Sequence, residues 1–321
     1  MKASVVTPNY NGKKFLKTYF DSLNNNKESI GEVILVDNGS TDGSIEFIEN
    51  YSKNLDFPVI IIKNTENLGF AKAVNQGILK SSYPYIFSLN NDTEVKKHSI
   101  APLIDLISSD DNIFSVASKM LQFDNKNLID DAGDEYNILA WTKKTGENQS
   151  AENYNRVYEI FSSCAGAAIY NKAILDKIGL FDENFFAYME DVDLSYRAKI
   201  NGYKNLFCSE SVVYHIGSAT SGSRYNEFKV KLAARNNVWV VYKNLPIPQK
   251  ILNFIFLFLG FSIKYLFFVK KGFGKTYLEG LKEGLKTRNK INKVKFTKKN
   301  TKNYFKIEWK LIVNAFKFLK K

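Results

Sequence analysis

A strand followed by a polar turn and a helix occurs four times in succession at the start of the chain, and this repetition restricts the fold more than any other feature. The apolar runs are "ASVVT", "VILV", "VIII" and "YIFSL", and each ends in polar residues. Strands that alternate with amphipathic helices predict a parallel sheet with helices on both faces. The expected fold class is therefore α/β, with a mixed and mostly parallel sheet.

The polar ends of these strands should lie along one edge of the sheet. In open sheets of this kind, the ligand crevice lies beyond the carboxyl ends of the strands. This rule places Thr7, Pro8, Asp37 and Asp92 on one rim. We therefore expect the functional site at this edge.

Asp37 and Asp92 each have a functional and a structural interpretation. Asp37 precedes an Asn-Gly-Ser turn, where an acid accepts hydrogen bonds from a base or ribose, or caps the turn. Asp92, in "IFSLNNDTEV", offers the carboxylate that a hard divalent cation on a diphosphate requires. It would equally suit the N-cap of a helix over "TEVKKHSIAPLIDLI".

Acids and a histidine recur later in the chain. "MEDVDL" contains Glu190, Asp191 and Asp193. If a helix begins here, its positive end stabilises the ionised carboxylate that a general base needs, although a capped helix with solvated acids fits the same pattern. His215 ends a strand-type run and is a metal ligand, a base or a structural histidine.

Seven ordered segments resemble the bacterial family 2 glycosyltransferases, specifically the branch named for rhamnosyltransferases, over roughly residues 1–240. The segments are "VVTPNYNG", "ILVDNGSTDGS", "NLGFAKAVNQG", "LNNDTEV", "SCAGAAIYNK", "GLFDENFFAYMEDVDLSYRAKINGYK" and "VYHIGSATSG". The resemblance implies a GT-A fold and a catalytic domain over residues 1–240. It also implies an inverting, metal-dependent transfer of a sugar, with rhamnose as one candidate, from a nucleotide diphosphate donor to an acceptor hydroxyl.

The resemblance assigns roles to individual residues. Asp191 would be the catalytic base, with Glu190 beside it, and Asp92 and His215 would hold Mg²⁺ or Mn²⁺. Asn90 replaces the first acid of the family's D-x-D motif. The implied nucleotide-binding residues are Thr7, Pro8, Asn9, Tyr10, Asp37, Asn67, Gly69, Asn75 and Asn91. The implied donor and acceptor cleft is Cys164, Ala165, Gly166 and Ala167. Asp131 and Gly133 resemble a further family segment, without an assigned role.

The end of the chain, residues 241–321, has a different character. The net charge is +12, and residues 264–321 alone contain 18 Lys and Arg against three acids. Residues 251–269 form an apolar run that Lys264 interrupts. A single crossing would put the basic tail on the outer side, so we expect a helix that lies in the membrane interface or re-enters it.

The last helix supports membrane attachment. Phe305, Trp309, Ile312, Phe316 and Leu319 recur at helical spacing, with lysines on another face. This pattern favours a basic amphipathic helix on an anionic membrane, and a helix packed on the catalytic domain remains the alternative. The N-terminus lacks the apolar core of a signal peptide. We therefore expect the cytoplasmic face of the cell membrane.

Three functional hypotheses follow. The first is a membrane-associated glycosyltransferase that extends a glycan or lipid-linked acceptor in cell-surface polysaccharide synthesis. The second is a non-catalytic nucleotide-sugar-binding protein, suggested by Asn90. The third, a nucleic-acid-binding protein, is disfavoured because the excess positive charge is confined to the tail.

Overall fold

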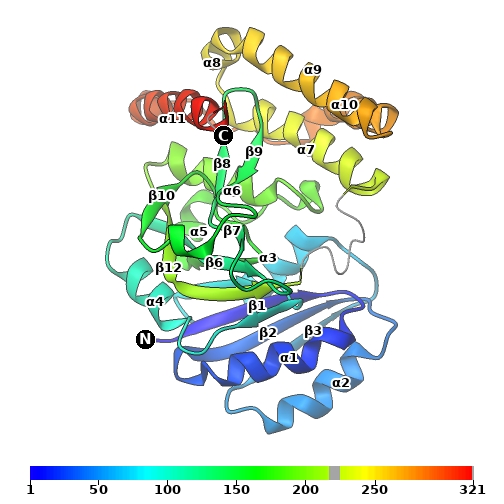
Figure 1. Cartoon of the computed structure of the whole chain (residues 1–321), viewed down its shortest axis with the longest axis vertical. Helices are drawn as coiled ribbons and strands as arrows, with labels where there is room; N and C mark the ends of the chain where they lie inside the picture. The colour runs from blue at the N-terminus through cyan, green and yellow to red at the C-terminus, as the bar shows by residue number, and fades with distance from the viewer. Residues whose placement is uncertain (217–224, 320–321) are drawn as a thin grey trace.

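A mixed ten-stranded sheet forms the centre of the protein (Figure 1), whose computed structural model describes residues 1–216 and 225–319. The first half of the sheet is parallel, in the order β3-β2-β1-β4. These strands are β1 (Ala3–Asn9), β2 (Ile30–Asn38), β3 (Val59–Asn64) and β4 (Tyr85–Leu89). The helices α1 (Lys13–Asn24), α2 (Ser44–Tyr51) and α3 (Phe70–Lys80) connect them.

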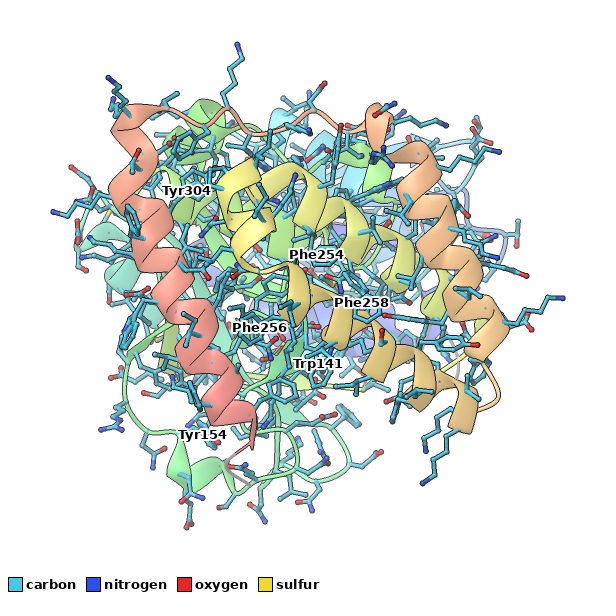
Figure 2. All side chains as sticks on the ribbon, turned by 90° about the horizontal axis from the view of Figure 1, so that it is seen from above. Trp141, Tyr154, Phe254, Phe256, Phe258 and Tyr304 are labelled. Atoms are coloured by element: carbon cyan, nitrogen blue, oxygen red, sulfur yellow. The ribbon has the colours of Figure 1, made fainter. Side chains whose placement is uncertain are left out.

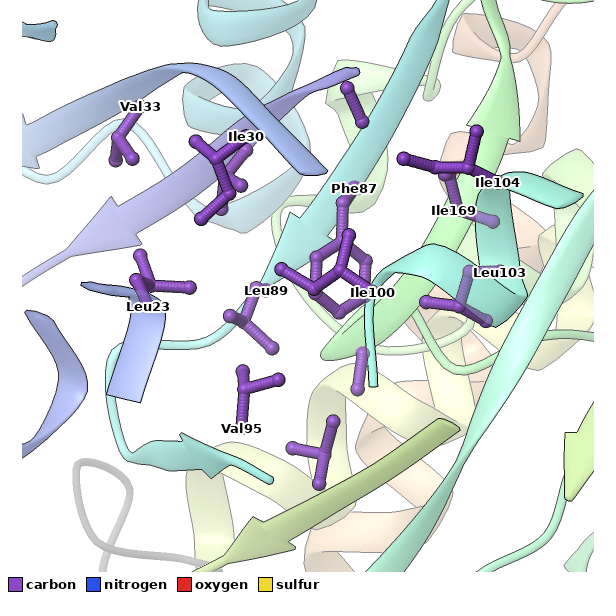
Figure 3. Packing of buried hydrophobic residues seen from close by; sticks show 14 of the residues in the cluster. Leu23, Ile30, Val33, Phe87, Leu89, Val95, Ile100, Leu103, Ile104 and Ile169 are labelled. Atoms are coloured by element: carbon purple, nitrogen blue, oxygen red, sulfur yellow. The ribbon is translucent and has the colours of Figure 1, made fainter. Parts of the chain in front are cut away.

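The strands of this half are apolar on both sides because helices cover both faces. Val33 and Leu35 belong to one buried cluster, which also contains Phe20 of α1. The intervening Ile34 belongs to a second cluster, together with Val74 of α3. Figure 3 shows the first cluster, where Leu23 of α1 and the β4 side chains meet. The predicted parallel sheet with helices on both faces is confirmed here.

The second half of the sheet is mixed. β11 (Ala167–Asn171) runs antiparallel between β4 and β6 (Ile113–Gln122), and β12 (Lys204–His215) runs parallel to β6. The remaining strands are short, and β8 and β9 form a separate two-stranded sheet. The short strands are β5 (Thr93–Val95), β7 (Ile129–Asp131), β8 (Asp134–Tyr136), β9 (Thr142–Lys144) and β10 (Tyr158–Ile160).

Asp92 does not cap a helix, so the structural alternative for this residue is wrong. Residues 93–95 form β5, which pairs antiparallel with β12, and α4 begins only at Ala101 and ends at Ser108. Thr93 and Val95 are β-branched residues, which pack well in a strand. This pairing sets Thr93 opposite His215 and brings the histidine close to Asp92.

The remaining helices lie between β11 and the C-terminus. Helices α8 to α11 lie at the end of the molecule opposite α2 (Figure 1). The expected boundary at residue 240 falls inside α7, and α6, α7 and α11 share one hydrophobic cluster. The elements are α5 (Lys172–Ile178), α6 (Glu190–Ile200), α7 (Glu227–Asn244), α8 (Ile247–Leu252), α9 (Phe254–Lys270), α10 (Gly274–Thr287) and α11 (Thr301–Leu319).

The apolar run at residues 251–269 is divided between two helices. α8 ends at Leu252 and α9 begins at Phe254. Asn253 between them is 1% exposed and donates a hydrogen bond to Glu308 of α11 at 3.0 Å. Across the described ranges, 1–216 and 225–319, none of the helices combines the length and apolarity that a membrane crossing requires.

Candidate active site

The carboxyl ends of β1 and β2 are joined by a buried polar network. Asp37 is fully buried, and its carboxylate accepts hydrogen bonds from the Asn9 side chain at 2.7 Å and the Ser40 backbone at 2.8 Å. Asn9 in turn accepts a hydrogen bond from Asn91, at 2.6 Å. Asp37 therefore stabilises its own turn, as the structural alternative predicted, and links this turn to the segment after β4.

The other residues expected to bind the nucleotide on β1 differ in exposure. Thr7 is fully buried, with its hydroxyl bonded to Tyr19 of α1. Pro8 is partly buried, while Tyr10 is 39% exposed at the end of the strand. Tyr10 therefore has the accessible side chain of the three.

The turn before α3 connects β2 to the loop that precedes α6. The Asn67 side chain accepts a hydrogen bond from the Gly69 backbone at 3.0 Å. Gly69 has φ +87° and ψ 167°, a region that is essentially open only to glycine. Asn75 bonds the backbone N–H and carbonyl of Phe181, at 3.1 and 2.9 Å. Asn75 thereby holds the backbone at Phe181, in the loop that leads to the acidic segment at Glu190.

Asp92 and His215 face each other at the end of β12. Asp92 is 6% exposed, and its Oδ1 atom has no hydrogen-bond partner among the described residues. His215 Nε2 lies 3.7 Å from this oxygen, and His215 Nδ1 lies 2.8 Å from Asp130 Oδ2. An orphaned carboxylate oxygen beside an imidazole nitrogen is a suitable ligand pair for Mg²⁺ or Mn²⁺.

Lys144 is the fourth charged or titratable residue beside Asp92, His215 and Asp130, and it pairs with Asp130. Its ammonium lies 3.0 and 3.1 Å from the two oxygens of Asp130. Burial acts to raise the pKa of Asp130, but the hydrogen bond from His215 and the charge of Lys144 lower that pKa to about 2. Asp130 is therefore an anion at neutral pH.

Asp191 lies at the start of α6 against the segment that contains Cys164 and Ala165. Burial raises the pKa of Asp191, while the backbone amides of Val192 and Ala165 act to lower it. Burial also raises the pKa of Glu190 well above its usual value. The predicted helix start at Glu190 is confirmed, but the helix end does not keep both carboxylates at ordinary acidity, because desolvation outweighs it.

Asp193, the third acid of "MEDVDL", forms buried ion pairs that join two helices. Asp193 is fully buried and contacts Arg197 at 3.0 Å and Lys243 at 2.9 Å. Burial acts to raise its pKa, but these two cations lower it overall. Asp193 thus joins α6 to α7 and does not face the candidate cleft.

The sequence segment "IDDAGD" adds acids beside Asp191. One ligand atom each from Asp131, Asp134 and Cys164 lie within 4.8 Å of one another. Burial and neighbouring acids raise the pKa of Asp131 to about 6 and that of Asp134 well above its usual value. Lys144 opposes the shift in both, so an internal cation already offsets part of this negative charge.

The backbone before α6 is strained and braced from α7. Phe186, Tyr188 and Met189 all have positive φ angles, of 64°, 68° and 71°. Such backbone clusters at functional sites when its surroundings hold it in place. The Asn236 amide donates to the carbonyls of Phe185, Ala187 and Tyr188 at 2.9, 2.9 and 2.7 Å. We did not predict Asn236 from the sequence, although the polar pair "NN" in an otherwise apolar part of α7 marks it.

The residues assigned to the site are linked by contacts. The network of Asp37 reaches Asn91, which adjoins Asp92, and the Asn90 backbone donates to the Gly166 carbonyl at 2.9 Å. Ala165, next to Gly166, contacts Asp191. Residues from five separated segments, at Asn9, Asp37, 90–92, 165–166 and Asp191, are thus joined at the carboxyl edge of the sheet.

Comparison with known proteins identifies relatives over much of the chain. The family model described as glycosyl transferase family 2 matches residues 4–179. The uncharacterised glycosyltransferase YfnE of Bacillus subtilis is 27% identical over 214 residues, 63% of this chain and 49% of YfnE. The abequosyltransferase RfbV of Salmonella typhimurium is 31% identical over 117 residues, 36% of this chain and 35% of RfbV. The chain thus spans half or less of these relatives.

Two solved structures resemble the fold closely. GalNAc-T7, solved with UDP, GalNAc and Mn²⁺, has a TM-score of 0.61 at 20% identity, over 75% of this chain and 47% of its own. The mannosyltransferase PcManGT of Pyrobaculum calidifontis was solved with GDP-mannose and Mn²⁺. It has a TM-score of 0.57 at 12% identity, over 90% of this chain and 87% of its own. At these identities the likeness concerns the fold alone, and it confirms the expected α/β fold of the GT-A type.

Proposed function

The chain belongs to glycosyl transferase family 2, and from this premise we propose that it transfers a sugar, with inversion, from a nucleotide diphosphate donor to an acceptor hydroxyl. The observation that carries the proposal is that residues 165–166 contact both acidic segments: Gly166 accepts a hydrogen bond from the Asn90 backbone, two residues before Asp92, and the Ala165 backbone contacts Asp191. It sets a pair of candidate metal ligands and a candidate base around one short segment. Inversion requires the base and the metal ligands to lie on opposite sides of the donor sugar, because the nucleophile attacks opposite the leaving group.

The donor diphosphate would lie at the end of β4, next to Asp92 and His215. A divalent cation bound by these two residues would stabilise the negative charge of the departing diphosphate. The residue pair fits a hard cation because Asp92 Oδ1 is buried and unpaired among the described residues. Asn90 reduces the number of carboxylates, so we expect the diphosphate and water to complete the coordination.

Asp191 would act as the general base. A sugar hydroxyl is a weak acid, so its proton must be accepted as the new bond forms. The raised pKa of Asp191 makes it a stronger base than an exposed aspartate once it is ionised. Ala165 and Ala167 are buried, at 2% and 1% exposure, so of the residues assigned to the sugar cleft only Cys164 is partly exposed beside Asp191.

The nucleotide would extend from the diphosphate toward the β1 and β2 turns. Asp37 and Asn9 hold these turns, and Asn67 holds the turn at Gly69. We place Asp37 near the base or ribose, on the strength of the sequence resemblance. The assignment to the rhamnosyltransferase branch also rests on the sequence resemblance. Rhamnose is therefore the first donor sugar to test.

The acceptor is proposed to be a growing glycan or lipid-linked sugar at the cytoplasmic face of the membrane. The support is an exposed apolar surface on α8, α9 and α11 (Figure 2). Its large exposed side chains are Ile247, Ile251, Leu252, Phe254, Ile255, Phe256, Phe258, Leu259, Ile263, Leu266, Phe267, Val269, Phe305, Trp309 and Phe316. An exposed patch of this size is typical of an interaction surface.

The surface is firmly attached to the rest of the protein. Tyr304, Ile307 and Leu311 of α11 are buried in the cluster shared with α6 and α7, while Phe305 and Trp309 are 72% and 69% exposed. α11 therefore packs on the catalytic domain along one face, as the alternative interpretation predicted, and its opposite face leaves Phe305 and Trp309 exposed. The side chain of Leu319 lies outside the described residues. Because residues 264–321 are strongly basic, an anionic membrane surface is the proposed partner.

A protein that only binds nucleotide sugars is the less supported alternative. It accounts for Asn90 but gives no role to Asp191. Melting temperatures with a panel of nucleotide sugars and Mn²⁺ would identify the donor, because a bound ligand stabilises the native state.

With that donor, Asp191→Asn should lower the transfer rate by about 10²–10⁴-fold and leave donor binding nearly unchanged. The change removes the base without removing any proposed contact to the nucleotide. Turnover equal to wild type would refute the role of Asp191. Absence of any donor hydrolysis or transfer by the wild type would favour the binding protein.

A further inference from the structure

We propose that Asp130 is the positioning residue that orients His215 for metal binding, and that Lys144 holds Asp130 in place. This inference rests on the metal-assisted reaction proposed above. None of the assigned roles includes Asp130, which the sequence shows only as the first acid of "DDAGD". The proposal follows from the contacts of the histidine ring.

The two ring nitrogens of His215 face two different carboxylates. Nδ1 lies 2.8 Å from Asp130 Oδ2, at hydrogen-bond distance, and Nε2 lies 3.7 Å from Asp92 Oδ1. An ionised carboxylate only accepts hydrogen bonds, so Nδ1 must carry the proton. The Nε2 lone pair then points to the side of Asp92, as a metal ligand requires.

The spacing of Nε2 and Asp92 Oδ1 is suitable for one shared ion. Bonds of about 2.0–2.2 Å from a metal to nitrogen and oxygen ligands can span the 3.7 Å between these atoms. Histidine ligands of metals usually donate the other ring N–H to a carboxylate, which fixes the tautomer and the orientation of the ring. Asp130 occupies this position relative to His215.

The backbone explains why Asp130 reaches the histidine. In the pairing of β6 with β7, Met120 lies opposite Asp131 and Leu121 lies opposite Ile129. Asp130 is therefore the extra residue of a β-bulge, and bulges commonly redirect a side chain next to an active site. Asp130 contacts His215, while the adjacent Asp131 lies with Asp134 and Cys164.

Lys144 fixes the carboxylate from a third element. It extends from β9 and contacts both oxygens of Asp130, at 3.0 and 3.1 Å. The side chains of His215 and Asp130 are only 13% and 18% exposed. β7, β9 and β12 thus each contribute one residue to a partly buried chain that ends at the candidate ion.

Nuclear magnetic resonance of the full chain labelled with ¹⁵N-histidine tests this proposal directly. The sequence contains two histidines, His98 and His215, and His98 is exposed, so it serves as an internal reference. Long-range ¹H–¹⁵N correlations report which ring nitrogen carries the proton. We expect His215 to be protonated on Nδ1 in the wild type and to shift toward Nε2 protonation in Asp130→Ala.

Manganese affinity supplies the second readout, measured by electron paramagnetic resonance with Mn²⁺ alone. Asp130→Ala should weaken Mn²⁺ binding by about 10–100-fold, the usual effect of losing such a carboxylate. Asp130→Glu should recover both the tautomer and most of the affinity. Asp130→Asn keeps the volume and an acceptor oxygen, so it should fall between them and replaces the alanine variant if that variant does not fold. Asp105→Asn, on the exposed side of α4, is the matched control and should change neither signal.

The proposal is overturned if His215 of the wild type is protonated on Nε2, or if Asp130→Ala leaves tautomer and Mn²⁺ affinity unchanged. A stability loss without either change would also overturn it, because it would leave Asp130 a purely structural role. Neither readout needs a donor or an acceptor. Failure of the proposed glycosyl transfer would therefore be seen separately, as absent turnover in a protein whose tautomer still responds to Asp130.

Discussion

Replacing Gly69 with alanine should disturb the candidate site through a single added methyl group. At φ +87° and ψ 167°, a residue with a side chain is strained by about 1–3 kcal/mol. The new Cβ would also lie 2.6 Å from the Phe186 ring and 2.7 Å from the Phe186 carbonyl oxygen. Overpacking of this kind costs about 1–3 kcal/mol more.

These terms combine to a net destabilisation of about 1–6 kcal/mol, after about 0.4–1 kcal/mol is subtracted for the reduced entropy of the unfolded chain. Gly272 provides the matched control, since it has φ +83° but no heavy atom from the described part of the chain lies within 4 Å of the added Cβ. Gly272→Ala should therefore cost only the backbone strain, about 1–2 kcal/mol. The difference between the two variants isolates the contact of Gly69 with Phe186.

Urea unfolding followed by circular dichroism measures both variants, and melting temperatures with and without the donor measure binding. Gly69→Ala should lose more stability than Gly272→Ala. It should also lose stabilisation by the donor, because the displaced Phe186 backbone accepts a hydrogen bond from the Ala71 amide in the first turn of α3, next to the proposed nucleotide-binding residues Asn67 and Gly69. Equal stability losses, or a donor response like that of wild type, would refute this reasoning.

Three further predictions concern stability, pH and membrane binding. Asp193→Asn should lower the unfolding free energy by about 3–5 kcal/mol in urea, since it removes the buried acid that pairs with Arg197 and leaves Lys243 with Asp182 alone; a loss below 1 kcal/mol would contradict this. The raised folded-state pKa of Asp131, about 6 against 3.8, means that its stabilising effect is complete below pH 3.8 and is lost as the pH rises through 6. Unfolding at a series of pH values should therefore show a decline of up to roughly 3 kcal/mol that is missing in Asp131→Asn, and parallel profiles would disprove it. Trp309→Ser should weaken sedimentation with anionic vesicles by about tenfold or more, with Asp105→Asn as the unaffected control, whereas unchanged binding would exclude α11 from the contact.

Patterns of local origin were predictable from the sequence. The strands at β1 to β4, the helix after Gly69 and the helix start at Glu190 follow from periodicity and turn residues, and the structure has all of them. The carboxyl-edge rule also predicted that Asp37 and Asp92 lie at one edge, and the hydrogen bonds of Asn9 join their two segments there. These features depend on residues that are close together in the chain.

Features that depend on distant partners were not predictable. β5 is a strand because β12, more than 100 residues later, pairs with it. The apolar run at residues 251–269 breaks at Asn253, which bonds Glu308 of α11. Asp130 acquires its contacts through a bulge that no local pattern signals, and the polar pair at Asn236 marks an unusual position without indicating its partners before α6.

Anomalous diffraction from crystals soaked with Mn²⁺ and the nucleoside diphosphate of the donor would test the central claim most directly. The proposed reaction predicts one manganese peak between Asp92 and His215, with the diphosphate beside it and Asp191 on the opposite side of the donor sugar position. A peak between Asp131 and Asp134, or a nucleotide bound away from the ends of β1, β2 and β4, would contradict it.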